Sequence, residues 1–276
     1  MASGPTRGYG IVERTEAASL VAQCAERIRL VGYAVLPSGL SNAVIADLSD
    51  RLDRVMARQV QEFGGHDRME SIGDTLTARC PLLYDEAFLA LATHAGVLSV
   101  ARALLGEFIV LMQQNGVINP AGREHTQTSY HRDLPYQHFV SSRPLAVGAL
   151  FCLDPFTVET GATTVLPASH RMEAFSSAEV AAALELPVIA DPGSFILFDA
   201  MVFHRAGANR SDRPRRAVNQ VFSVPIIAQQ ISLPDALGGR YADDSALAPL
   251  LGYGATPAPS VLAWRERRLA RMSKIS

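Results

Sequence analysis

A histidine and an aspartate two positions apart, His131 and Asp133, are the side chains in this sequence best suited to bind a metal. Residues i and i+2 of a strand point to the same face, so both can project inward from one strand. His204 lies far along the chain, after a predicted strand and turn, and supplies a third candidate ligand. Two imidazoles and one carboxylate on one face of an octahedron leave three positions open. This arrangement suits Fe(II), which must also bind a bidentate co-substrate and O2.

A candidate anion-binding residue follows the third ligand. Arg215 lies 11 residues after His204 (215 − 204), across a turn and at the start of the next predicted strand. An arginine there can bind the distal carboxylate of 2-oxoglutarate with two parallel hydrogen bonds. Arg213 and Arg216 are alternatives. We expect Arg216 on the opposite face of the strand and Arg213 in the turn.

The elements that must position these residues change character near residue 106. Before it, apolar residues recur at helical spacing. Thr15 is the predicted N-cap of the first helix, which ends at Gly32, and Ser41 is the predicted N-cap of a long second helix. A third helical region ends at Gly106, a good position for a left-handed C-cap. A short strand is expected at residues 33–36 and a loop at residues 64–77.

After residue 106 the apolar residues alternate with period two, which predicts strands. They are expected at residues 108–118, 145–153, 163–166, 194–198 and 217–224, with a helical insertion at 176–186 and a final helix at 264–271. Helices first and many short strands later predict an α+β fold in which helices buttress an antiparallel sandwich or barrel. We predict one domain over residues 1–276, with a helical part at about 12–106, a barrel core at about 107–226 and a C-terminal extension at 227–276.

Several spaced motifs between residues 113 and 223 resemble the phytanoyl-CoA dioxygenase-like family of Fe(II)- and 2-oxoglutarate-dependent oxygenases. The family's H-x-D pair matches His131 and Asp133. Its segment H-x-x-x-x-N-x-S-x-x-x-R matches four residues in order: His204, Asn209, Ser211 and Arg215. Residues 160–170 resemble the family's N-G-x-x-x-x-x-P-G-S-H stretch, with Thr160 in place of Asn and Ala168 in place of Gly.

The resemblance implies a double-stranded β-helix, also called a jelly-roll or cupin-like barrel, with Fe(II) at its open end and 2-oxoglutarate and O2 as co-substrates. It implies oxidation of an unactivated C–H bond of a small-molecule metabolite with release of succinate and CO2. Hydroxylation is the default outcome. Halogenating relatives carry a small residue where this chain has Asp133, so a halogenase is not expected.

Further candidates surround the predicted ligands. Gln113, Asn115 and Asn119 share one face of their strand by alternation, and in similar enzymes amides on this strand contact 2-oxoglutarate. Asn115, Asn119 and Ser211 are therefore predicted to bind the co-substrate, although polar residues on a solvated strand face would show the same pattern. The predicted substrate pocket contains Gln127, Tyr136 and His138.

Composition limits the other functional classes. A net charge of −2 gives no support for a nucleic-acid surface. No signal peptide and no uninterrupted apolar run of membrane-spanning length is visible, and three scattered cysteines fit a reduced compartment, so a cytoplasmic protein is expected. GxSxG, P-loop and GxGxxG motifs are lacking. Two alternatives stay open: a cupin-like metal enzyme that does not use 2-oxoglutarate, and a non-catalytic jelly-roll binding protein. The oligomeric state and the substrate are not predicted.

Overall fold

Two antiparallel sheets form the centre of the fold. The computed structural model describes residues 17–122, 127–134 and 139–273. Within these residues a large sheet has the strand order β1-β7-β4-β9-β3-β2, and a small sheet has the order β6-β5-β8. The strands are β1 Tyr33–Pro37, β2 Thr77–Arg79, β3 Val110–Asn119, β4 Ala146–Cys152, β5 Thr164–Val165, β6 Leu186–Pro187, β7 Ser194–Asp199, β8 His204–Arg205 and β9 Arg215–Ser223. Two facing antiparallel sheets with crossed connections are a jelly roll, as the sequence predicted.

The two faces of the large sheet pack against different layers. Directly paired residues share a face, and alternate residues of β4 and β7 fall into two separate apolar clusters. The inner cluster lies between the two sheets and includes Leu150, Cys152, Ile196, Phe198 and Ala217. The outer cluster joins the opposite face to the N-terminal helices. The central strand β4 is buried along its whole length because both of its faces are covered.

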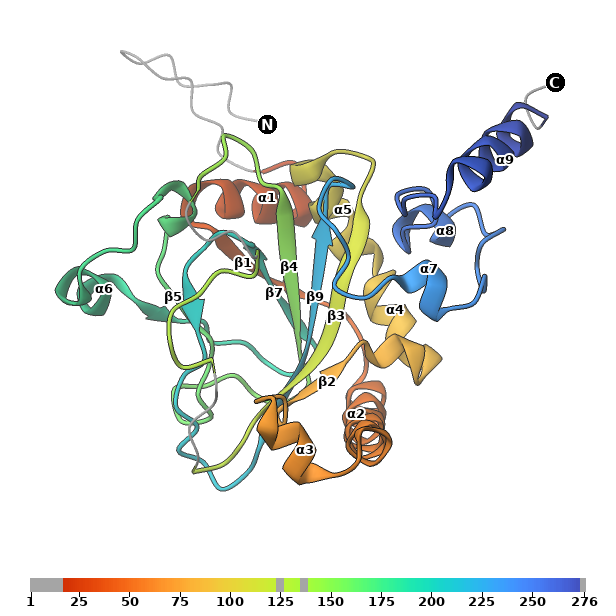
Figure 1. Cartoon of the computed structure of the whole chain (residues 1–276). Helices are drawn as coiled ribbons and strands as arrows, with labels where there is room; N and C mark the ends of the chain where they lie inside the picture. Colours follow the sequence, from red (N-terminus) through yellow and green to blue (C-terminus); the bar gives the residue numbers. More distant parts are fainter. Residues whose placement is uncertain (1–16, 123–126, 135–138, 274–276) are drawn as a thin grey trace, which may run out of the picture.

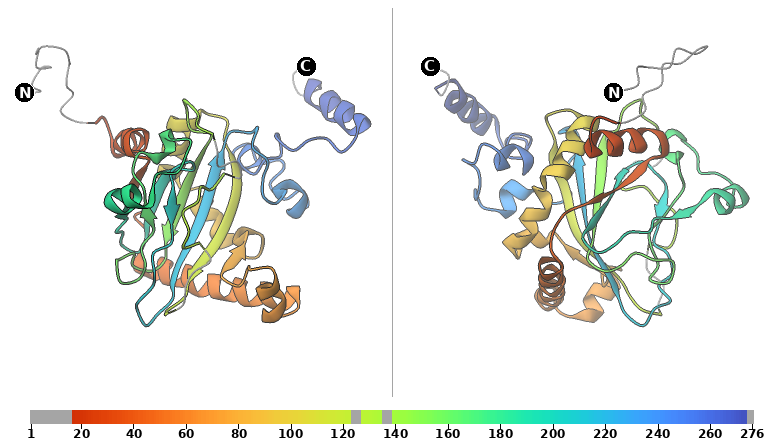
Figure 2. Two further views of the ribbon diagram at one scale, coloured as in Figure 1. Left: turned by 60° about the vertical axis from the view of Figure 1, so that its left-hand side comes forward. Right: turned by 180° about the vertical axis from the view of Figure 1, so that it is seen from behind.

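Helices cover the outer face of the large sheet (Figures 1 and 2). Their bounds are α1 Leu20–Val31, α2 Asn42–Phe63, α3 His66–Ser71, α4 Leu89–Ala92, α5 Ala95–Leu105, α6 Ala178–Leu184, α7 Leu233–Ala236, α8 Leu247–Leu250 and α9 Val261–Met272, with 3-10 turns at Pro81–Leu83, Glu86–Phe88 and Ser169–Arg171. α1 and α5 lie across one end of the sheet and α2 lies near the other, whereas α6 and α9 project from the body on opposite sides (Figure 1).

The small sheet is extended by the segment that carries the H-x-D pair. His131 and His204 form an antiparallel bridge in which each backbone N–H donates to the other residue's carbonyl, at 2.9 and 3.1 Å. The N–H of Asp133 donates to the carbonyl of Ala200 at 3.0 Å. This ladder places two segments side by side that are separated by about seventy residues in sequence.

Most predicted elements are present, with four corrections. Ser19, and not Thr15, is the N-cap of α1, because its hydroxyl accepts from the N–H of Ala22; Thr15 lies outside the described residues. The predicted loop at 64–77 contains α3. Gly106 has a positive φ of 95° but an extended ψ of 176°, so its cap is not left-handed helical. The short strands β2 and β8 were missed because two or three residues have no periodicity of their own.

Gly116 allows α2 to approach β3 closely, and we predict that it cannot be enlarged without cost. A Cβ at Gly116 would lie 2.2 Å from Cδ1 of Leu52, which is fully buried. Gly116→Ala should therefore lower the free energy of unfolding by about 1–3 kcal/mol through overpacking. In a denaturant titration the double variant with Leu52→Ala should show a smaller loss than the sum of the two single losses. If the two losses in free energy of unfolding are additive, the side chain added at position 116 does not clash with Leu52.

No single helix among the described residues has the length and apolar character of a membrane span, although the bent pair formed by residues 86–92 and 95–105 reaches them together.

Candidate metal centre

Three side chains converge between the two sheets. His131 comes from the strand-like segment that extends the small sheet, His204 begins β8, and Asp133 lies two residues after His131. One ligand atom from each lies within 4.8 Å of the other two. The Oδ1 of Asp133 is 3.4 Å from Nε2 of His204 and 4.0 Å from Nε2 of His131. These three residues are the ones that the sequence analysis selected, and their spacing fits a single ion held on one face.

Hydrogen bonds behind the site orient the three candidate ligands. Nδ1 of His131 lies 3.1 Å from the carbonyl of Ser129, and Nδ1 of His204 lies 3.1 Å from the carbonyl of Val202. A carbonyl can only accept, so each Nδ1 carries a proton, and in the neutral imidazole each Nε2 has a lone pair for a metal. The other carboxylate oxygen, Oδ2 of Asp133, accepts from Nδ2 of Asn219 at 3.1 Å. The donor set is therefore oriented before any ion binds.

The charges of the site favour an ionised aspartate. Burial raises the pKa of Asp133, but hydrogen bonding to His204 and the nearby imidazoles and Asn219 outweigh this and leave the pKa below its ordinary value. Burial lowers the pKa of His204, but the hydrogen bond and charge of Asp133 leave it raised. Burial and the neighbouring His204 lower the pKa of His131. Without a metal, His204 is thus the site's preferred proton carrier.

We predict that metal affinity depends on the pH through His204. A metal binds neutral imidazole, so an ion must displace the proton whenever the pH is below the raised pKa of His204. The apparent affinity for Co(II), a spectroscopic substitute for Fe(II), should fall about tenfold per pH unit below that pKa and level off above it. The stability of the metal-free protein has the opposite pH dependence. It falls as the pH rises through the same pKa, because the stabilising His204–Asp133 pair is then lost. Absorption titrations from pH 6 to 9 measure the first effect, and an affinity that does not change over this range would contradict the assignment.

Arg215 lines the same cavity as the triad, at the first position of β9. Its side chain is 3% exposed, and within the described part of the chain it makes no hydrogen bond or ion pair. Its guanidinium carbon lies 4.0 Å from the centre of the Phe156 ring. Burial lowers the pKa of Arg215 to about 10. A buried cation without an ion-pair partner is costly, and an anion from outside the chain would offset that cost.

Unpartnered polar atoms around Arg215 support a polar ligand. In the register of β3 and β9, Asn115 pairs with Asn219 and Asn119 pairs with Arg215, so these four side chains share the inner face. Each has one buried polar atom without a hydrogen-bond partner: Oδ1 in the three asparagines and Nε in the arginine. Unpartnered buried atoms are rare in folded proteins, and four on one face, in two pairs separated by Val117 and Ala217, fit a carboxylate-bearing ligand with bound water.

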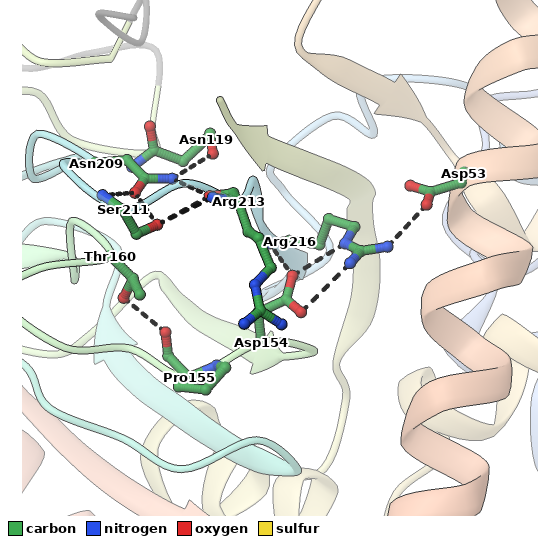
Figure 3. A network of polar contacts seen from close by, with 9 residues as sticks. All are labelled: Asp53, Asn119, Asp154, Pro155, Thr160, Asn209, Ser211, Arg213 and Arg216. Atoms are coloured by element: carbon green, nitrogen blue, oxygen red, sulfur yellow. Dashed lines mark hydrogen bonds and ion pairs between the residues drawn. The ribbon is translucent and has the colours of Figure 1, made fainter. Parts of the chain in front are cut away.

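The neighbouring arginines have other partners. Arg216 lies on the opposite face of β9, as alternation predicts, and its guanidinium contacts Asp53 at 2.7 Å and Asp154 at 3.0 Å (Figure 3). The side chain of Arg213 is 85% exposed in the turn. Arg215 is therefore the arginine of this segment that faces the triad.

Asn209 and Ser211, the other residues of the distal motif, build the turn that leads to Arg215. The amide of Asn209 donates to the carbonyls of Asn119 and Arg213, at 3.0 and 2.8 Å, and its Oδ1 accepts from Ser211 (Figure 3). The hydroxyl of Ser211 also donates to the carbonyl of Arg213. In this arrangement Ser211 stabilises the turn, and a contact between Ser211 and 2-oxoglutarate stays a prediction.

The remaining candidates lie at varying distances from the triad. Gln127 lines the cavity with His131 and His204. Asn115 donates to Gln230 at 3.0 Å, and Asn119 donates to the carbonyl of Gly207 at 2.9 Å, so both amides already have one protein partner. Tyr136 and His138 lie outside the described residues. Asn219 was missed, although alternation from Arg215 places it on the same face.

The two departures from the family's N-G-x-x-x-x-x-P-G-S-H stretch lie in turns. The hydroxyl of Thr160 donates to the carbonyl of Pro155 at 2.7 Å (Figure 3). Ala168 adopts φ 62° and ψ 2°, the left-handed conformation that glycine adopts without strain. Both residues support the turns without contacting the triad.

The comparisons with known proteins agree with this fold. An uncharacterised protein of Mycobacterium tuberculosis is 34% identical over 221 residues, which are 78% of this chain and 80% of the relative. Dioxygenase af480 of Aspergillus fumigatus is 26% identical over 196 residues, 68% of this chain and 61% of its own. Among solved structures, EctD from S. alaskensis superimposes with a TM-score of 0.62 at 22% identity, over 80% of this chain and 82% of its own. The epimerase SnoN does so with a TM-score of 0.59 at 23% identity, over 74% and 84%.

Fold and site together define a jelly-roll protein with a two-histidine, one-carboxylate centre. The family model of phytanoyl-CoA dioxygenase (PhyH) matches residues 28–217. The chain belongs to this family of non-haem iron, 2-oxoglutarate-type dioxygenases.

Proposed function

We propose that this protein is an Fe(II)- and 2-oxoglutarate-dependent oxygenase that oxidises an unactivated C–H bond of a small-molecule metabolite. In this proposal His131, Asp133 and His204 hold the iron, and Arg215 binds the distal carboxylate of 2-oxoglutarate. The observation that carries the proposal is the buried guanidinium of Arg215, which has no ion-pair partner among the described residues and lies on the wall of the cavity that contains the triad.

The residues of the chain have separate tasks in this proposal. The triad binds one face of the ion and leaves the other open for a bidentate co-substrate. Arg215 and the asparagine amides on β3 and β9 orient that co-substrate by its far end. With 2-oxoglutarate and O2, the bound iron would supply the oxidant for the C–H bond, with release of succinate and CO2. The apolar residues Val117, Leu150 and Phe198 line the same cavity and exclude water from it.

Hydroxylation is the proposed outcome. The structural relatives include the α-ketoglutarate-dependent epimerase SnoN and the carbocyclase SnoK. Both names give outcomes other than hydroxylation for proteins of the same fold, and we infer that the position of the substrate over the iron selects the outcome in this protein. We propose a small-molecule substrate, as in SnoN, which was solved with α-ketoglutarate and nogalamycin RO.

Anaerobic absorption spectroscopy tests the proposal. The purified protein is titrated with Fe(II) and then with 2-oxoglutarate, and a weak visible charge-transfer band should appear only when both are present. Succinate release on admission of air is then measured with and without a panel of candidate substrates. Iron binding without a band would favour a metal enzyme that does not use 2-oxoglutarate. Absence of iron binding would leave a non-catalytic jelly-roll protein.

A further inference from the structure

Arg132 lies between the two candidate ligands of the H-x-D pair and points away from them. It is 3% exposed, and its guanidinium donates to four backbone carbonyls. Nε binds Met201 at 2.7 Å, Nη2 binds Ser169 at 3.1 Å and also Met172, and Nη1 binds Glu173 at 3.4 Å. The planar fork of an arginine can reach several acceptors at once, which a lysine cannot.

These acceptors lie on two segments that are distant in sequence. Met201 belongs to the stretch that leads from β7 to His204. Ser169 belongs to the 3-10 turn Ser169–Arg171, and Met172 and Glu173 follow it. The guanidinium carbon of Arg132 also lies 3.9 Å from the centre of the Phe203 ring, immediately before His204. Arg132 thus joins the H-x-D segment, the 169–173 turn and the segment that carries His204.

The ladder between the ligand-bearing segments explains why such a connection is needed. His131 pairs with His204, whereas the N–H of Asp133 donates to the carbonyl of Ala200. The two contacts are therefore two residues apart on the H-x-D segment but four residues apart on the segment that carries His204. Residues 201–203 therefore form a bulge between these two ladder contacts. Several hydrogen bonds hold it. Met201 accepts from Arg132, Phe203 donates to Oγ of Ser169 at 2.8 Å, and Oδ1 of Asp199 accepts from the N–H of Met201 at 2.9 Å. The N–H of Val202 also donates to the carbonyl of Asp199 at 2.9 Å, and the carbonyl of Phe203 accepts from the N–H of Leu166 at 2.8 Å.

We propose that Arg132 is a positioning residue that sets the separation of Asp133 and His204 by fixing this bulge to the 169–173 turn. The proposal rests on the metal-binding role proposed for the triad. Arg132 itself does not touch the ion or the co-substrate. Loss of the hydrogen bonds from its guanidinium to these carbonyls allows residues 201–203 to move, and His204 then moves relative to the two candidate ligands on the other segment.

The test measures metal geometry and not only activity. Co(II) affinity and the visible spectrum of bound Co(II) are compared in wild type, Arg132→Met and Arg132→Lys, alongside the Fe(II)–2-oxoglutarate band. Arg132→Met should bind Co(II) about 10–100-fold more weakly, the range typical of outer-shell changes, with a shifted spectrum. Arg132→Lys should lie between it and wild type. Both variants should have a lower kcat than wild type, with little change in the KM for 2-oxoglutarate.

Arg171→Met is the matched control. Arg171 lies in the same 3-10 turn, but it donates to the carbonyl of Arg29 on α1 and not to the ligand-bearing segments. Its loss should leave Co(II) affinity and spectrum unchanged. If Arg132→Met does not fold, the Co(II) affinity and spectrum of Arg132→Lys test the inference. A folded variant of Arg132 with wild-type Co(II) affinity and spectrum overturns the inference. Failure of the wild type itself to bind metal would instead refute the proposed function.

Discussion

Arg215→Met should stabilise the protein in the absence of co-substrate and at the same time remove its affinity for 2-oxoglutarate. The guanidinium is buried, and it makes no ion pair or hydrogen bond among the described residues. Replacing even a buried ion pair by apolar side chains of similar volume is often neutral or stabilising by about 1–4 kcal/mol, and replacing a buried charge that has no ion-pair partner should stabilise the protein in the same direction. The lost charge-assisted pair with the ligand should raise the KM for 2-oxoglutarate roughly 30- to 5000-fold, from about 2–5 kcal/mol for truncating one partner of a buried charge pair.

Thermal unfolding and succinate release measure the two effects of this substitution. In wild type, 2-oxoglutarate with a redox-inert metal should raise the unfolding temperature, because a ligand at 100 times its Kd contributes about 2.7 kcal/mol. Arg215→Met should unfold at a higher temperature than the unliganded wild type and should not respond to 2-oxoglutarate. Metal affinity should change little, because Arg215 is not one of the candidate ligands.

Arg216→Met is the control on the next residue of the same strand. Arg216 binds Asp53 and Asp154 on the outer face. Its loss should destabilise the protein moderately and leave the KM for 2-oxoglutarate unchanged. If Arg216→Met raised this KM and Arg215→Met did not, the assignment of the anion-binding arginine would be wrong.

The contrast between these neighbouring arginines shows which parts of the site can be predicted from sequence. Period-two alternation is a local property, so the opposite orientations of Arg215 and Arg216 follow from the strand alone. The same reasoning reaches Asn219, four residues after Arg215. The role of Arg132 could not be predicted in this way, because its acceptors are backbone carbonyls of a turn and a bulge. Any residue type can supply a carbonyl, so the sequence carries no signal for it.

The fold shows the same division. Long elements with a strong pattern, such as α2 and β9, were predicted within a few residues. The short strands β2 and β8 were not, because two or three residues have no measurable period and their pairing depends on the partner strand. His204 lies in one of these strands. Its convergence with His131 depends on that pairing, so the sequence could name both histidines through spacing and family resemblance but could not derive their contact.

Asp133→Ala should abolish turnover by removing the charged ligand of the metal centre. The carboxylate lies within 4.0 Å of both imidazoles and is nearly buried. Its loss leaves two neutral donors and no compensating charge for a divalent ion. We expect Fe(II) affinity to fall by about 1000-fold or more, beyond the 10–100-fold typical of outer-shell substitutions. The metal-free protein should remain folded, and the pKa of His204 should fall once its acidic partner is gone.

Asn219→Ala separates the loss of a ligand from the loss of its orientation. Asn219 donates to the carboxylate oxygen of Asp133 that faces away from the imidazoles. The alanine variant keeps all three candidate ligands, so excess Fe(II) should restore most of its turnover, whereas no concentration of Fe(II) should restore that of Asp133→Ala. Equal rescue of both variants would show that the carboxylate is dispensable. In that case the unpaired Arg215 would still indicate an anion site, but the metal would have to be bound by other groups.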